Sequence, residues 1–125
     1  MQVKEGLIAE AGKLKIDDVQ DFTTFTSAVI DDKAFKRITS YIEHAKQSPN
    51  LEIIQGGTYS DAKGYFVNPT IVQSKDPKDK IMVEEIFGPV LTAYVYKDAD
   101  LQKTMDLVHT STKFALTGAV FAQDE

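Results

Sequence analysis

The stretch from Val90 to Ala122, VLTAYVYKDADLQKTMDLVHTSTKFALTGAVFA, is the most regular part of the sequence. Its pattern predicts a strand over Val90–Tyr96, a helix over Ala99–Thr110 and a second strand over Leu116–Ala122. A crossover helix of about a dozen residues between two strands is typical of a right-handed parallel unit. The predicted fold class is therefore α/β, with a mainly parallel sheet that is covered by helices.

Upstream of this unit, the clearest element is an amphipathic helix. Asp31 or Asp32 can cap its free N–H groups, and Ser48-Pro49 ends it, because the residue before a proline avoids helical geometry. The apolar positions at helical spacing are Phe35, Ile38, Ile42 and Ala45. We expect this stripe to face the core.

The remaining predicted elements are shorter or less regular. They are a helix over Val3–Leu14, an extended segment over Phe22–Ile30, a strand over Leu51–Ile54 that Gly56-Gly57 closes, an extended segment over Tyr65–Val72 with a kink at Pro69, a turn over Lys75–Asp79 and a short helix over Lys80–Glu85. The chain ends directly after the last predicted strand, and three or four strands are few for a parallel sheet. We therefore expect it to be a segment of a larger domain.

Composition excludes several classes of function. The 125 residues contain 14 Lys plus Arg and 19 Asp plus Glu, a net charge of −5 that argues against nucleic-acid binding. The sequence has no cysteine, which excludes disulfides, Cys-ligated zinc and a thiol nucleophile. No apolar run approaches the roughly 18 residues of a membrane span, and the N-terminus has no secretory signal. These features favour a soluble intracellular protein.

The two histidines and the Gly56-Gly57 pair match no catalytic, metal-binding or phosphate-binding motif. His44 and His109 each lie near the end of a predicted helix, where a solvated imidazole suits the helix dipole. No metal-binding motif surrounds them, so we expect no metal site. Gly56-Gly57 lacks the spacing of a phosphate-binding loop and is better explained as a turn that ends a strand.

The six residues Glu84-Glu85-Ile86-Phe87-Gly88-Pro89 differ in kind from these. From composition alone, the stretch can be explained as two solvated carboxylates and a phenylalanine of the core. The alternative is that a carboxylate accepts hydrogen bonds from two vicinal ribose hydroxyls while the nearby ring covers a planar face. A nucleotide would be the ligand in that case.

The stretch Glu84–Val90, EEIFGPV, resembles the hallmark of the NAD(P)-dependent aldehyde dehydrogenases. The order of the surrounding segments is similar too, with GYFVNPTI at Gly64–Ile71 and LTGAVF at Leu116–Phe121. Three further stretches resemble the mitochondrial Δ1-pyrroline-5-carboxylate dehydrogenase branch of the family. They are DFTTF at Asp21–Phe25, SAVIDDK at Ser27–Lys33 and SKDP at Ser74–Pro77.

One departure lies in the first 20 residues, where Ile16-Asp17-Asp18-Val19 replaces the family's usual Gly-Asp-Pro turn. The resemblance implies that residues 1–125 are part of the three-layer α/β/α catalytic domain, following the nucleophilic cysteine. The NAD-binding domain would be absent from this chain. By matching the motif, Glu85 would bind the nicotinamide-ribose hydroxyls of NAD, and Phe87 would pack beside that ribose.

The resemblance further implies a parent enzyme that oxidises glutamate γ-semialdehyde to glutamate in proline catabolism, in the mitochondrial matrix and as a homo-oligomer. The family uses a cysteine thiolate as nucleophile, so this chain alone is expected to be inactive and to bind NAD weakly. Its partner would be the remainder of the parent polypeptide. Two other possibilities remain open, a stand-alone binding module without catalysis and a module for oligomerisation through exposed strand edges.

Overall fold

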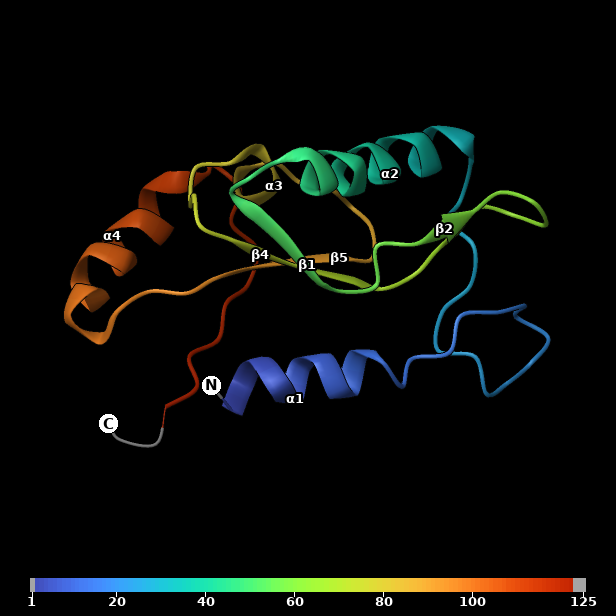
Figure 1. The fold of residues 1–125 in the computed structure, drawn as a ribbon, viewed down its shortest axis with the longest axis horizontal. Helices are drawn as coiled ribbons and strands as arrows, with labels where there is room; N and C mark the ends of the chain where they lie inside the picture. The colour runs from blue at the N-terminus through green and yellow to red at the C-terminus, as the bar shows by residue number, and fades with distance from the viewer. Residues whose placement is uncertain (1, 123–125) are drawn as a thin grey trace.

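The computed structural model describes residues 2–122 and contains a three-stranded mixed sheet (Figure 1). Its strands are β1 (Leu51–Gln55), β4 (Thr70–Ser74) and β5 (Val90–Tyr94), in the order β1-β4-β5. β1 pairs antiparallel with β4, and β5 pairs parallel with β4 in the register Thr70 to Val90. The α/β fold class is confirmed, but the sheet is mixed and not mainly parallel, because β4–β5 is its parallel pairing and β1–β4 is antiparallel.

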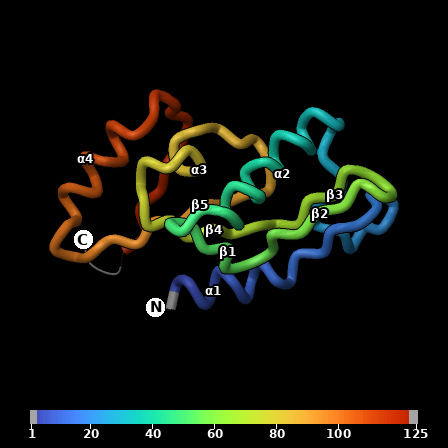
Figure 2. Tube along the Cα trace, turned by 45° about the horizontal axis from the view of Figure 1, so that its top comes forward, coloured from blue at the N-terminus to red at the C-terminus, as the bar shows by residue number. Residues whose placement is uncertain are grey.

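Helices lie on both faces of this sheet. The helices among residues 2–122 are α1 (Gln2–Ala11), α2 (Asp32–Gln47), α3 (Lys80–Val83) and α4 (Leu101–Ser111), the last preceded by a short 3₁₀ turn over Asp98–Asp100. α2 covers one face and α1 crosses the other (Figures 1 and 2). A second, two-stranded sheet pairs β2 (Tyr59–Ser60) with β3 (Phe66–Val67). Among residues 2–122, no helix is long and apolar enough to cross a membrane.

α2 is the element around which the core forms, as its sequence predicts. The Asp31 carboxylate accepts a hydrogen bond from the Ala34 N–H at 2.7 Å, and the helix ends at Ser48 as expected before proline. Ile38 and Ile42 are fully buried against strand residues such as Val72. The predicted apolar stripe is therefore the inner face of the helix.

The Gly56-Gly57 turn joins β1 to the segment that leads to β4. Both residues have positive φ, +76° and +82°, where glycine avoids the cost of a Cβ. At Gly56 a Cβ would also overlap the carbonyl oxygen of Pro69. Pro69 itself separates β3 from β4, which confirms the predicted kink.

Three predictions need correction. Residues 116–122 form no strand, and Leu116, Val120 and Phe121 are at least 89% exposed. Within residues 2–122 these side chains pack against no apolar face, so the segment gains little from forming a strand. The parallel pair forms between β4 and β5 instead, with α3 in the connection. The segment predicted to be extended over Phe22–Ile30 contains a turn at residues 22–23 and forms one isolated bridge, between Thr26 and Ile16.

Boundaries shift elsewhere. α3 ends at Val83, so Glu84 and Glu85 lie beyond it, and β5 ends at Tyr94. The N–H of Glu84 donates to the Lys80 carbonyl at 2.9 Å and closes the last turn of α3. The two glutamates therefore begin the loop that leads into β5.

Candidate cofactor-binding site

The predicted motif forms the connection between α3 and β5. Asp79 caps α3 through the Ile81 N–H at 3.0 Å, which fixes where the connection starts. At its far end, the Pro89 carbonyl accepts a hydrogen bond from the Thr70 N–H of β4 at 2.9 Å. Both ends of the loop are thus tied to regular structure.

Most residues of this loop are exposed, with Ile86 as the buried exception among residues 84–88. Ile86 is 7% exposed and joins the core, whereas Phe87 is 80% exposed and Glu85 is exposed as well. Glu85 and Phe87 line one surface hollow of about 350 Å³ together with Thr92 and Leu91 of β5. Phe87 is therefore not a core residue, and the carboxylate and the ring are free for a ligand on the same side of the loop.

The backbone of the loop is unusual at Phe87, which has a φ of +52°. A bulky side chain at positive φ costs about 1–3 kcal/mol and persists only when its surroundings enforce the conformation. The next residue shows that α2 presses on the loop, because a Cβ at Gly88 would lie 2.5 Å from the Ile38 Cδ1. Glycine is the residue that permits this approach.

Two polar side chains of α2 also contact the loop. The Tyr41 hydroxyl donates a hydrogen bond to the Glu84 carboxylate, and this bond raises the pKa of Tyr41 above its ordinary value. The Arg37 Nη2 lies 3.4 Å from the Phe87 carbonyl oxygen, to which it donates. Sequence reasoning missed these contacts, because residues about 43 to 50 positions apart carry no local signal that pairs them.

The two adjacent glutamates consequently differ in role. Glu84 is engaged by Tyr41, while within residues 2–122 the Glu85 side chain makes no hydrogen bond. A carboxylate that is exposed and without a protein partner can accept two hydroxyl donors. The structure thus brings Glu85 and Phe87 together as expected and gives Glu84 a different task.

His44 departs from the prediction of a simply solvated imidazole. It lies in the last turn of α2, as predicted, but its Nε2 is 2.9 Å from Asp79 Oδ1. Burial raises the pKa of Asp79, but hydrogen bonds from the Ile81 N–H and His44 outweigh it, so the pKa is lower than usual. The pair joins the end of α2 to the start of α3. His109 is exposed in the last turn of α4, as predicted.

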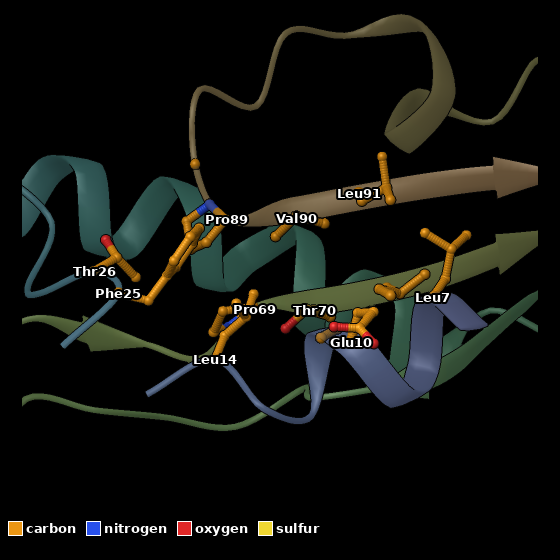
Figure 3. A pocket seen from close by; sticks show the side chains of 13 residues that line it. Leu7, Glu10, Leu14, Phe25, Thr26, Pro69, Thr70, Pro89, Val90 and Leu91 are labelled. Carbon is orange, nitrogen blue, oxygen red and sulfur yellow. The ribbon is translucent and has the colours of Figure 1, made fainter. Parts of the chain in front are cut away.

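A second hollow lies between α1 and the beginnings of β4 and β5 (Figure 3). It measures about 480 Å³ and is lined by apolar side chains such as Leu7, Phe25 and Leu91. Glu10 is its single ionisable lining residue, so it has no set of groups for acid–base chemistry. Within the described part of the chain, no cluster of His, Asp and Glu could hold a metal ion.

The curated relatives with high identity include mitochondrial Δ1-pyrroline-5-carboxylate dehydrogenases. Δ1-Pyrroline-5-carboxylate dehydrogenase of mitochondria is 54% identical in Danio rerio and 53% identical in Homo sapiens, each over 125 residues. The match covers 99% of this chain and 22% of each relative, so the chain spans about a fifth of their length.

Solved structures of aldehyde dehydrogenases are also similar to this chain. The Δ-pyrroline-5-carboxylate dehydrogenase of Mycobacterium tuberculosis superposes with a TM-score of 0.89 at 39% identity, over 98% of this chain and 23% of that one. A structure of betaine aldehyde dehydrogenase from Staphylococcus aureus, in complex with NAD⁺, gives 0.82 at 30% identity, over 98% and 24%. The model of the aldehyde dehydrogenase family matches residues 1–125. With its motif loop, its fold and its full length matched in this way, the chain belongs to the aldehyde dehydrogenase family.

Proposed function

We propose that this chain is part of an NAD-dependent Δ1-pyrroline-5-carboxylate dehydrogenase, which oxidises glutamate γ-semialdehyde to glutamate in proline catabolism. Identity of 53–54% to the mitochondrial enzymes over 99% of the chain supports this substrate. The same relatives support a location in the mitochondrial matrix. Homo-oligomerisation of the parent is part of the proposal and follows from the family resemblance.

Within that enzyme, Glu85 and Phe87 bind the nicotinamide ribose of NAD. The observation that carries this role is their shared exposure beside the hollow of about 350 Å³. The Glu85 carboxylate accepts hydrogen bonds from the two ribose hydroxyls, and charge-assisted bonds of this type are about twice as strong as neutral ones. The Phe87 ring shields the neighbouring face of the sugar from water. Bound NAD supplies the hydride acceptor.

Other tasks of the enzyme belong to parts outside these 125 residues. Residues 1–125 form part of the catalytic domain, and the nucleophilic cysteine and the NAD-binding domain lie elsewhere in the parent, since this chain has no cysteine. The isolated chain is therefore inactive and binds NAD weakly. Its partner is the remainder of the parent polypeptide, and the aldehyde is the substrate of the assembled enzyme.

The role of Glu85 is tested by Glu85→Gln in the full-length enzyme. The amide keeps the size of the side chain but removes its charge, so we expect KM for NAD to rise roughly tenfold to a hundredfold. Glu52→Gln, an exposed glutamate on β1, is the matched control and should leave KM for NAD unchanged. Equal KM values in the two variants would refute the ribose contact.

A second experiment tests whether the isolated chain lacks the activity that we propose for the parent enzyme. The purified 125-residue chain is mixed with glutamate γ-semialdehyde and NAD, and NADH is followed by absorbance. No NADH is expected, because no thiol is present to attack the aldehyde. Measurable turnover would show that the chain carries a nucleophile of another kind. Saturable NAD binding by the chain alone would favour the stand-alone binding module instead.

A further inference from the structure

The loop that carries Glu85 and Phe87 needs an external support. Residues 84–89 belong to no helix or strand, and Phe87 holds a positive φ that a bulky side chain does not adopt freely. A ligand site requires its first contacts to be held close to the productive geometry. The support must therefore come from another element.

α2 is the element that is in place to provide it. It presents Arg37, Ile38 and Tyr41 to the loop, within about one helical turn. Each reaches a different point, since Tyr41 holds the Glu84 carboxylate, Arg37 holds the Phe87 carbonyl and Ile38 packs against Gly88. The contacts flank Glu85 on both sides.

α2 is itself held by a cap at its start and by burial of its inner face. α2 is capped by Asp31, and its inner face is buried along its length, including Ile38 and Ile42. The Tyr41 ring is held further by the Lys80 ammonium, which lies 5.4 Å from the ring centroid. A tyrosine hydroxyl with the ordinary pKa of about 10 is protonated at physiological pH, and donation to Glu84 raises the pKa of Tyr41 further.

We propose that Arg37 and Tyr41 are positioning residues of the cofactor site, which fix the backbone on either side of Glu85 and thereby aim Glu85 and Phe87 at the nicotinamide ribose. Neither residue touches the cofactor. The inference rests on the ribose-binding role of Glu85 and Phe87 and adds to it the two α2 side chains through which that geometry is maintained.

The test compares matched variants of the full-length enzyme. Tyr41→Phe removes the bond to Glu84, and Tyr59→Phe removes a tyrosine–glutamate bond, from Tyr59 to Glu43, in which no residue of the loop takes part. Arg37→Met and Lys36→Met each delete one cation from adjacent positions of α2, and Lys36 pairs with Asp32 rather than with the loop. KM for NAD, KM for the aldehyde, kcat and Tm are measured for each.

We expect Tyr41→Phe and Arg37→Met to raise KM for NAD roughly threefold to tenfold each, with KM for the aldehyde unchanged. Tyr59→Phe and Lys36→Met should leave both KM values as they are. A general loss of structure would instead lower Tm and change both KM values together. Arg37→Lys, which can still donate to the Phe87 carbonyl, should restore part of the affinity that Arg37→Met loses.

Two outcomes overturn the inference. In one, Tyr41→Phe and Arg37→Met bind NAD as tightly as their controls while Glu85→Gln does not, so the ribose contact stands and positioning by α2 fails. In the other, Glu85→Gln has no effect on KM for NAD, and the ribose-binding role itself fails together with the inference.

Discussion

α2 and α4 are amphipathic helices that the same sequence pattern predicts, yet they are packed very differently. Six residues of α2 are buried, including Phe35, Ile38 and Ile42, whereas no residue of α4 is buried. Leu101, Met105 and Val108 of α4 are each more than half exposed. A helical stripe therefore shows which face can be buried, but a neighbouring layer is needed to bury it.

The starts of the two helices differ too, because α2 has a side-chain cap and α4 has none. Asp31 caps α2 with its side chain, while Asp100 at the start of α4 makes no side-chain cap bond. Part of the stability of α2 thus comes from local hydrogen bonds and part from the sheet beneath it. Among the described residues, α4 has no side-chain cap bond at its start and no buried residue. Four pairs of substitutions test how local and tertiary contributions differ across the fold.

The largest effect is expected in the buried stripe. Ile38→Ala leaves a cavity beneath α2 and should lower the free energy of unfolding by about 2–5 kcal/mol. The equivalent truncation in α4, Val108→Ala, removes a side chain that is 69% exposed and should change it by less than about 0.5 kcal/mol. Urea unfolding of the 125-residue chain measures both. Similar losses would show that α4 packs as tightly as α2.

The next largest effect separates two glycines. Gly56→Ala forces a Cβ onto positive φ and into the Pro69 carbonyl, so a loss of about 1–3 kcal/mol is expected. Gly6→Ala lies in α1 with open space around its Cβ, and should stabilise the chain by roughly 0.5–1 kcal/mol. Thermal unfolding should therefore shift in opposite directions for the same substitution. A shift in one direction would contradict the geometry of the Gly56 turn.

A smaller effect is expected at the helix caps. Asp31→Ala removes the acceptor of the Ala34 N–H and should cost about 1 kcal/mol. Asp100→Ala removes an exposed ion pair with Lys103 and no cap bond, so a few tenths of a kcal/mol is expected. The two values come from chemical unfolding under identical conditions. If Asp100→Ala cost as much as Asp31→Ala, α4 would be capped in solution.

The smallest effect is pH-dependent and concerns the link between α2 and α3. Because the pKa of Asp79 is lowered on folding, its ionised form stabilises the fold above the unfolded-state pKa of about 4. That contribution disappears as the pH falls through the lower, folded-state pKa. Asp79→Asn keeps a capping side chain but not the charge, and should be less stable than the wild type at pH 7.

The difference in unfolding free energy between Asp79→Asn and the wild type should shrink as the pH is lowered below about 4. Asp106→Asn removes one carboxylate from the exposed face of α4, outside the link between α2 and α3, and serves as the control. Chemical unfolding of each protein is measured at about five pH values from about 2.5 to about 7, which gives the change of its unfolding free energy with pH. A difference that stayed constant with pH would mean that the Asp79 charge is not coupled to folding.

Much of the fold was predictable because its signals are local. Asp31, the stripe through Ile38 and Ser48-Pro49 place α2 within a residue or two, and Gly56-Gly57 marks its turn correctly. The strand predicted over Leu116–Ala122 failed for a different reason. Its apolar residues favour a strand, but a strand also needs a partner edge and an apolar face, and neither is visible in a local pattern.

The candidate site divides in the same way. Glu85 and Phe87 were identified from the motif and from the resemblance that it carries. The support of the loop by Arg37 and Tyr41 was not predictable, nor was the pairing of His44 with Asp79. Side chains from distant positions meet only after α2 has packed on the sheet, because chain folding and not sequence spacing sets those distances.

The sequence by itself determined the residues with fixed backbone preferences and the helix that carries the apolar stripe, since caps, glycine turns and periodicity act over a few residues. The tertiary structure decided which stripe became a core, which glutamate remained free and how Phe87 is held at positive φ. These outcomes depend on burial and on contacts between α2 and the loop at residues 84–89, which require the sheet and the helix to be assembled first.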